Sequence, residues 1–188
     1  GVYKKLFIES LGNGVYTFKY ADLDGSNEET KTITKADYAG KTMGFFSIET
    51  GMAMDLEPAV WDFKFTRYWT RLEADPGDTV QYMVTGVLTH PGLSVAQANN
   101  VDPIDVNFTD YSADLSDSTL KIIGHDWKDF TFGNGWVIPT DLVYFVKTGN
   151  EDVWKVQFID FEGSSTGTST FEITFETNLT SVEDPFSK

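Results

Sequence analysis

The chain has 188 residues, a length typical of one globular domain, and it contains no cysteine. Its 29 acidic and 14 basic residues give a formal net charge of -15, which disfavours nucleic acid and anionic lipid as partners. The lack of cysteine excludes thiolate metal sites, iron–sulfur clusters and cysteine nucleophiles. No run of about 18 apolar residues occurs, so the sequence predicts no membrane-spanning segment.

Aromatic residues make up 15% of the chain, which favours strands with half-buried faces. The first two expected strands, KKLFIES and GVYTFKYADL, are predicted to form a hairpin across the break at residues 12–14. In the second of them, alternation places Tyr16, Phe18 and Tyr20 on one face. Six further segments bounded by Gly, Pro, Asn or Asp have the same character: GFFSIET, AVWDFKFTRYWTRLE, TVQYMVTGVLT, DLVYFVKT, DVWKVQFIDFE and TSTFEITFET.

Helical periodicity is faint along the whole chain. The segments TKADYAG and SVAQANN each predict a turn or two of helix, capped by Thr34 and Ser94. Residues 94–129 predict a long irregular insertion, which is more often functional or mobile than a plain connector. The polar residues 149–152 predict a hairpin between LVYFVKT and VWKVQFIDF. We therefore expect an all-β, multi-stranded antiparallel fold with little helix, one domain over residues 1–180, and a C-terminal tail at residues 181–188.

The strand WDFKFTRYWTR contains the only two arginines of the protein, Arg67 and Arg71. Period two places both on the face that also bears Trp61, Phe63, Phe65 and Trp69, and this aromatic face is predicted to be mostly core. A buried guanidinium needs a carboxylate or carbonyl partner. The two interpretations left open are a structural ion pair and an anchor for an anion at the edge of a pocket.

Two segments carry a family resemblance. The pattern W-D-x-x-F-x-R-Y at Trp61 to Tyr68 and the hairpin YFVKTGNEDVWKVQFIDFEG at Tyr144 to Gly163 resemble the HmuY-like proteins, the hemophore family of Bacteroidetes bacteria. The resemblance covers residues 44–176. The final segment TNLTSVEDPFSK also resembles the spacer before the C-terminal sorting domain of type IX secretion cargo.

The resemblance implies an all-β HmuY-like domain whose loops hold one haem between two axial side chains, which are histidines in some members and methionines in others. It implies a protein that is secreted or held at the outer-membrane surface. It also implies that the protein is not an enzyme and passes haem to an outer-membrane transporter or another surface protein.

The available axial donors are few. His90 and His125 are the only histidines, they flank the long insertion, and they fall near the two regions that supply the family's ligands. They are therefore the first candidates, although each can also be a turn or loop residue. Methionine ligands are the fallback, as a mixed histidine–methionine pair or from Met52, Met54 and Met83.

A haem pocket also needs apolar walls and cations for the propionates. The candidate walls are Trp127, Phe130, Trp136 and Tyr111, and the candidate cations are Arg71, Lys121 and Lys128.

Other functions remain open as alternatives. Asp22 and Asp24 lack the full spacing of a calcium loop and predict a turn. No nucleophile elbow, zinc-protease helix or phosphate loop occurs. A surface-exposed glycan-binding module would use aromatic platforms such as Trp69, Tyr111, Trp136 or Trp154, and a structural cargo module would have lost haem binding.

Overall fold

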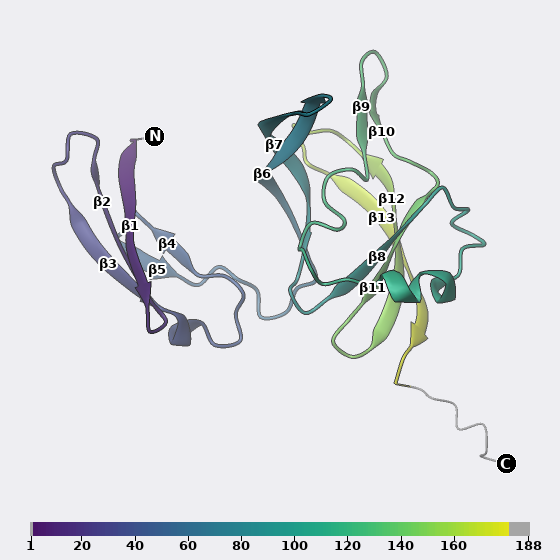
Figure 1. Ribbon diagram of the computed structural model, residues 1–188, viewed down its shortest axis with the longest axis horizontal. Helices are drawn as coiled ribbons and strands as arrows, with labels where there is room; N and C mark the ends of the chain where they lie inside the picture. The colour runs from purple at the N-terminus through teal and green to yellow at the C-terminus, as the bar shows by residue number, and fades with distance from the viewer. Residues whose placement is uncertain (1, 181–188) are drawn as a thin grey trace. The chain divides into compact units, whose positions relative to one another are not determined.

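The computed structural model of the protein describes residues 2–180, apart from the side chains of residues 74 and 75. These residues form thirteen strands, all paired antiparallel, and two 3-10 helices (Figure 1). The predicted all-β antiparallel fold with little helix is therefore confirmed. No helix in the described part of the chain is long and apolar enough to cross a membrane.

Contacts divide the chain into two compact units, one up to Val60 and one from Trp61 onward. The domain predicted over residues 1–180 thus contains two compact units. The tail predicted at residues 181–188 lies outside the described residues.

The first unit begins with a three-stranded sheet of β1 (Lys4–Gly12), β2 (Val15–Asp22) and β3 (Glu29–Thr34), in that order. The predicted hairpin between the first two strands is confirmed. Its connection is Asn13-Gly14, with φ of 51° and 75°, which matches the type I′ turn that suits the twist of two paired strands. Of the three aromatic residues predicted on one face of β2, Phe18 and Tyr20 are buried and Tyr16 is 38% exposed.

The rest of the first unit covers one face of this sheet. The 3-10 helix η1 (Lys35–Tyr38) occupies the predicted helical turn, but Thr34 makes no side-chain capping bond. The strands β4 (Phe45–Ser47) and β5 (Met52–Met54) pair as a short hairpin. Phe46 packs against Phe18 and Tyr20, with ring centroids 5.0 and 6.1 Å apart.

The second unit is built on a four-stranded sheet. Its strands are β8 (Ser94–Asn99), β11 (Leu142–Lys147), β12 (Asp152–Phe161) and β13 (Ser169–Asn178), in the order β13-β12-β11-β8. The predicted hairpin of β11 and β12 is confirmed, with Tyr144 opposite Val156.

The prediction of helix for SVAQANN is wrong. These residues form β8, which pairs along its whole length with β11. Val95, Ala96 and Ala98 are buried by this pairing. A short segment of small residues gives no clear local period, so the open edge of β11 determines its conformation.

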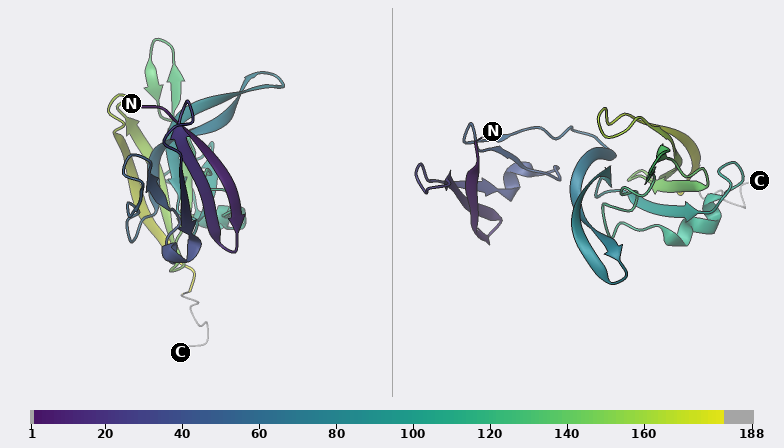
Figure 2. Two further views of the ribbon diagram at one scale, coloured as in Figure 1. Left: turned by 90° about the vertical axis from the view of Figure 1, so that its left-hand side faces the viewer. Right: turned by 90° about the horizontal axis from the view of Figure 1, so that it is seen from above.

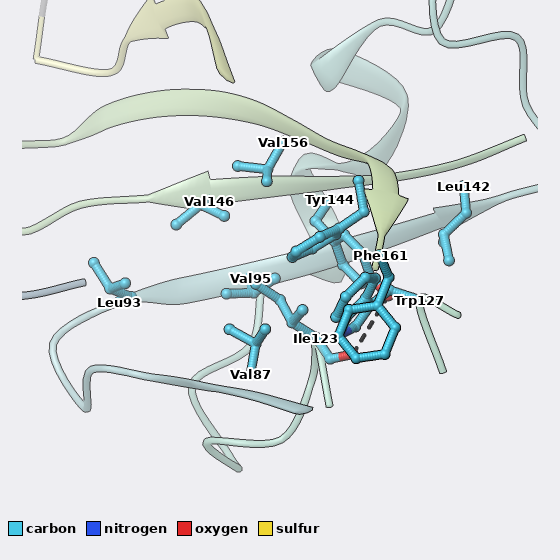
Figure 3. Packing of buried hydrophobic residues seen from close by; sticks show 11 residues of the cluster. Val87, Leu93, Val95, Ile123, Trp127, Leu142, Tyr144, Val146, Val156 and Phe161 are labelled. Atoms are coloured by element: carbon cyan, nitrogen blue, oxygen red, sulfur yellow. Dashed lines mark hydrogen bonds between the residues drawn. The ribbon is translucent and has the colours of Figure 1, made fainter. Parts of the chain in front are cut away.

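Both faces of the sheet are buried, as the sequence of β11 shows. Leu142, Tyr144 and Val146 belong to one hydrophobic cluster, while Val143 and Phe145 belong to the cluster on the other face. Figure 3 shows the first cluster, in which Tyr144 and Val146 lie near Val87, Val95 and Ile123. The core of the second unit therefore lies on the two sides of β11.

The insertion at residues 94–129 is more regular than predicted. Besides β8 it contains the 3-10 helix η2 (Phe108–Asp114), where the Asn107 side chain accepts a hydrogen bond from the Thr109 backbone N–H at 2.8 Å. Phe108 is buried against Phe145. This helix closes the second cluster, and so part of the insertion is core structure.

Two hairpins complete the second unit. The strands β6 (Phe63–Asp75) and β7 (Asp78–Thr89) form a long, strongly twisted ribbon (Figure 2). The strands β9 (Asp129–Thr131) and β10 (Gly135–Val137) form a short one.

The predicted core face of β6 is wrong over most of its length. Arg67, Trp69 and Arg71 are exposed, and Phe65 is 44% exposed. Only the start of the strand lies against the four-stranded sheet, where Phe63 and Phe65 contact Phe171. Of the two interpretations of the arginines, the structural ion pair does not form among the described residues, and an exposed guanidinium needs no buried counter-charge.

The ribbon is fixed to the rest of the unit by a close backbone contact. The N–H of Val87 donates to the carbonyl of Gly124 at 2.7 Å, and the N–H of Gly124 donates back at 3.1 Å. A Cβ at Gly86 would lie 2.3 Å from the Gly124 carbonyl oxygen, and Gly124 itself has φ of +61°. Glycine is therefore required at both positions.

We expect Gly86→Ala to lower the free energy of unfolding by at least about 1–3 kcal/mol, because the added methyl group must displace backbone. Urea denaturation measures this change. Gly149→Ala is the matched control, since nothing lies within 4 Å of its added Cβ. Equal unfolding midpoints for the two variants would contradict the prediction.

Candidate functional site

A cavity of about 560 Å³ lies in the second unit, within the size range of small-molecule sites. The ribbon, the segment after Gly124 and the β9–β10 hairpin contribute most of its walls. Its lining residues are Leu72, Tyr82, Met83, Val84, Thr85, His125, Lys128, Asp129, Phe130, Trp136 and Ser164.

His125 enters this cavity because of the contact between Gly124 and Val87. The Nδ1 atom of His125 lies 3.5 Å from the Tyr68 hydroxyl, and the two rings meet edge-on with centroids 6.5 Å apart. A hydroxyl both donates and accepts, so Nδ1 of His125 can carry the proton and leave Nε2 with a free lone pair. This is the tautomer that ligates a metal through Nε2.

His90 has a different environment. Its Nδ1 accepts a hydrogen bond from the Gly92 backbone N–H at 2.9 Å, and its ring meets Trp61 edge-on at 4.8 Å. A backbone N–H can only donate, so neutral His90 carries its proton on Nε2 and has no free lone pair there. His90 thus stabilises the turn that follows β7, where its carbonyl accepts from the Leu93 N–H.

The two histidines do not line the same cavity. His125 follows Gly124, which pairs with Val87, whereas His90 lies beyond the end of β7 at Thr89. His90 is not among the residues around the cavity. The predicted axial pair therefore stays a prediction, in which His90 must first give up its bond to Gly92.

Lys128 is the most unusual residue of the cavity, because it is a cation that is only 4% exposed. Its Nζ donates to the Thr85 carbonyl at 2.6 Å and lies over the rings of Trp127, Phe161 and Trp136, at 4.1, 5.0 and 5.6 Å from their centroids. Burial lowers the pKa of Lys128 to about 8, and the nearby Asp126 opposes this shift. An ammonium held by carbonyl and aromatic groups keeps N–H donors for an anion.

Of the other predicted pocket residues, some line the cavity and others belong to the hydrophobic clusters. Phe130 and Trp136 line the cavity, as expected for walls. Trp127 instead is a core residue, 1% exposed and stacked on Phe158 at 4.1 Å. Tyr111 stacks on Phe145 in the other cluster.

The predicted cations and methionines are also dispersed. Arg71 is exposed and lies on the opposite face of β6 from the cavity residue Leu72, because neighbouring strand residues alternate. Met83 borders the cavity from β7. Met52 and Met54 belong to β5 of the first unit, whereas all cavity residues belong to the second.

The first unit has its own groove of about 510 Å³, lined mainly by apolar side chains that include Ile8, Phe18 and Phe46. It contains no histidine, because both histidines are in the second unit. The Asp22 and Asp24 carboxylates accept bonds from Ser26, and Asp22 also accepts from Lys4 and Asn27, as expected for a turn. No group of three or more metal-binding His, Asp or Glu side chains occurs in the part of the chain described.

Sequence reasoning missed the burial of Lys128 and the role of Tyr82 as a wall. Nothing in HDWKDF marks its lysine as buried, since two of the three rings that cover it, those of Trp136 and Phe161, lie outside this segment. The alternation of Tyr82 with Val84 is a usable signal, because both lie on the face of β7 shared with Tyr68.

Comparison with protein-family models, with curated proteins and with solved structures found no match to this chain.

We expect the stability of the wild type to rise relative to Lys128→Met between about pH 8 and pH 10.5. In that window the unfolded chain keeps the lysine proton, with its ordinary pKa of 10.5, while the folded protein has lost it. The unfolding free energy of the wild type minus that of Lys128→Met should increase by about 1–3 kcal/mol across this window. Urea denaturation at pH 7.5 and pH 10 measures it, with the exposed Lys35→Met as control. A pH-independent difference would contradict the lowered pKa.

Proposed function

We propose that this protein is an HmuY-like, non-catalytic haem-binding protein that is exported to the cell surface or secreted. The observation that carries the proposal is His125, whose Nδ1 lies 3.5 Å from the Tyr68 hydroxyl and which borders an aromatic cavity of about 560 Å³. The resemblance of residues 44–176 to the hemophore family supports the same function. The protein would then pass haem to an outer-membrane transporter or another surface protein.

The cavity residues suit a flat, largely apolar ligand with acidic groups. Phe130 and Trp136 meet edge-on at 5.4 Å and form an aromatic wall, which Tyr82 extends. Such rings contribute most of the affinity for a macrocycle through buried area. Lys128 supplies a cation beside them for a propionate. When bound, haem would supply an iron centre with two axial positions.

His125 is the first axial ligand of the proposal. Its Nδ1–H would donate to the Tyr68 hydroxyl oxygen, which would orient the imidazole as partners behind a metal ligand usually do. The second ligand is His90 or Met83. Met83 borders the cavity but lies on the opposite face of β7 from Tyr82 and Val84. His90 must break its bond to the Gly92 N–H.

Titration with haemin, followed in the Soret band, tests this function. We expect the wild type to give a saturable shift and His125→Ala to bind at least about tenfold more weakly, a loss of about 1.4 kcal/mol. His90→Ala and Met83→Leu identify the second ligand, because only the true ligand changes the spectrum of the complex. An unchanged spectrum of the wild type with excess haemin would overturn the proposal.

A metal-free porphyrin separates the pocket from the iron ligand. Protoporphyrin, followed by its fluorescence, should bind equally to the wild type and His125→Ala but more weakly to Phe130→Ala, which removes an exposed wall. If His125→Ala leaves haemin binding and its spectrum unchanged, the ligand assignment is wrong while the pocket assignment stands.

A further inference from the structure

The ribbon of the second unit carries a second surface, on the face of β6 opposite the cavity residue Leu72. Arg67, Trp69 and Arg71 lie on one face of β6, and Trp69 between the two arginines is 62% exposed. The residues opposite them on β7 are Thr85, Met83 and Gln81. We call Arg67, Trp69 and Arg71 the arginine–tryptophan face.

The two guanidinium groups have no side-chain partner in the described part of the chain. Neither arginine makes an ion pair or side-chain hydrogen bond among the described residues, although the chain has 29 acidic residues. Lysines behave differently, since six of them are paired with carboxylates: Lys4, Lys19, Lys31, Lys41, Lys147 and Lys155. The only two arginines of the chain are thus both exposed, on either side of an exposed indole, and neither is paired with any residue that the structure describes.

The spacing of this face suits a ring flanked by carboxylates. Residues two apart on a strand lie about 6.6 Å apart, so Arg67 and Arg71 are separated by about 13 Å with the indole midway. The guanidinium fork binds a carboxylate with two parallel hydrogen bonds. The flat indole offers an apolar surface to the C–H face of a sugar ring.

The charge of the whole protein narrows the choice of ligand. A net charge of -15 repels a densely charged polymer such as nucleic acid, which carries one phosphate per about 1.7 Å of duplex. Two isolated cations instead match sparse carboxylates. An added peptide strand would bind through backbone groups at an edge, which requires no exposed tryptophan on the face.

We propose that the arginine–tryptophan face binds polysaccharides that carry carboxylates on some of their sugars. Trp69 stacks on a sugar ring, and Arg67 and Arg71 pair with carboxylates on the neighbouring sugars. Arg71 lies on the opposite face of β6 from the cavity residue Leu72, whereas Met83 and Thr85, which pair with Trp69 and Arg67, also border the cavity. The test below therefore leaves haemin out.

Calorimetric titration with hyaluronan oligosaccharides, which have a carboxylate on every second sugar, tests the proposal. We expect the wild type to bind them and to bind the carboxyl-reduced, neutral form at least about tenfold more weakly. Trp69→Ala and the double variant Arg67→Gln with Arg71→Gln should each lose at least about tenfold in affinity. The double variant with lysine at both positions should retain part of it, since lysine keeps the charge but lacks the fork.

Matched controls separate this site from other effects. Phe132→Ala removes another exposed aromatic side chain, and His125→Ala removes the proposed haem ligand; both should bind hyaluronan as the wild type does. Unfolding midpoints of the Arg67, Trp69, Arg71 and Phe132 variants should be unchanged, because these side chains are exposed.

Three results would overturn the proposal. The first is no binding of the acidic oligosaccharide, and the second is equal binding by Trp69→Ala. The third is tighter binding of polyglutamate or single-stranded DNA, which would assign the face to an acidic polypeptide or a nucleic acid. Because haemin is absent, none of these results bears on the haem proposal.

Discussion

The close contact between Gly86 and Gly124 determines the arrangement of the second unit. Two backbone hydrogen bonds join Val87 to Gly124 across a space in which no side chain fits. This contact fixes the ribbon to the loop and places His125 next to Tyr68. The same loop continues into Trp127, which anchors it in the core, and Lys128, which reaches the Thr85 carbonyl. Without this contact, the ribbon and the loop that carries His125 and Lys128 would not be held together around the cavity.

The burial of Lys128 is the main energetic consequence of that arrangement. A buried ammonium normally pairs with a carboxylate, but this one is held by a carbonyl and three aromatic rings, and its pKa is lowered to about 8. Such a group destabilises the fold when it is charged and gains stability when a ligand brings a negative charge. A cation under this constraint is more typical of a binding site than of a structural ion pair.

The ribbon gives the protein two chemically different surfaces because its side chains alternate. One face presents Tyr68, Leu72, Tyr82 and Val84 toward the loop and the cavity. The other carries the exposed arginine–tryptophan face, with Met83 and Thr85, which also border the cavity, opposite Trp69 and Arg67. Only the start of β6 is covered by the four-stranded sheet, through Phe63 and Phe65. A strand that extends beyond its sheet can therefore expose an apolar ring that its sequence pattern would assign to the core.

The sequence alone determined the local structure that depends on neighbouring residues. Alternation and turn residues correctly predicted the β1–β2 and β11–β12 hairpins and the all-β class. The tertiary structure decided whatever depends on distant partners. It made Ser94–Asn99 a strand by pairing it with β11, exposed the arginines that the pattern placed in the core, and buried Lys128. It also separated the roles of His90 and His125, since one accepts a backbone N–H and the other faces a hydroxyl. The alternation of residues along a strand indicates which face each side chain is on, whereas only the folded chain determines what covers that face.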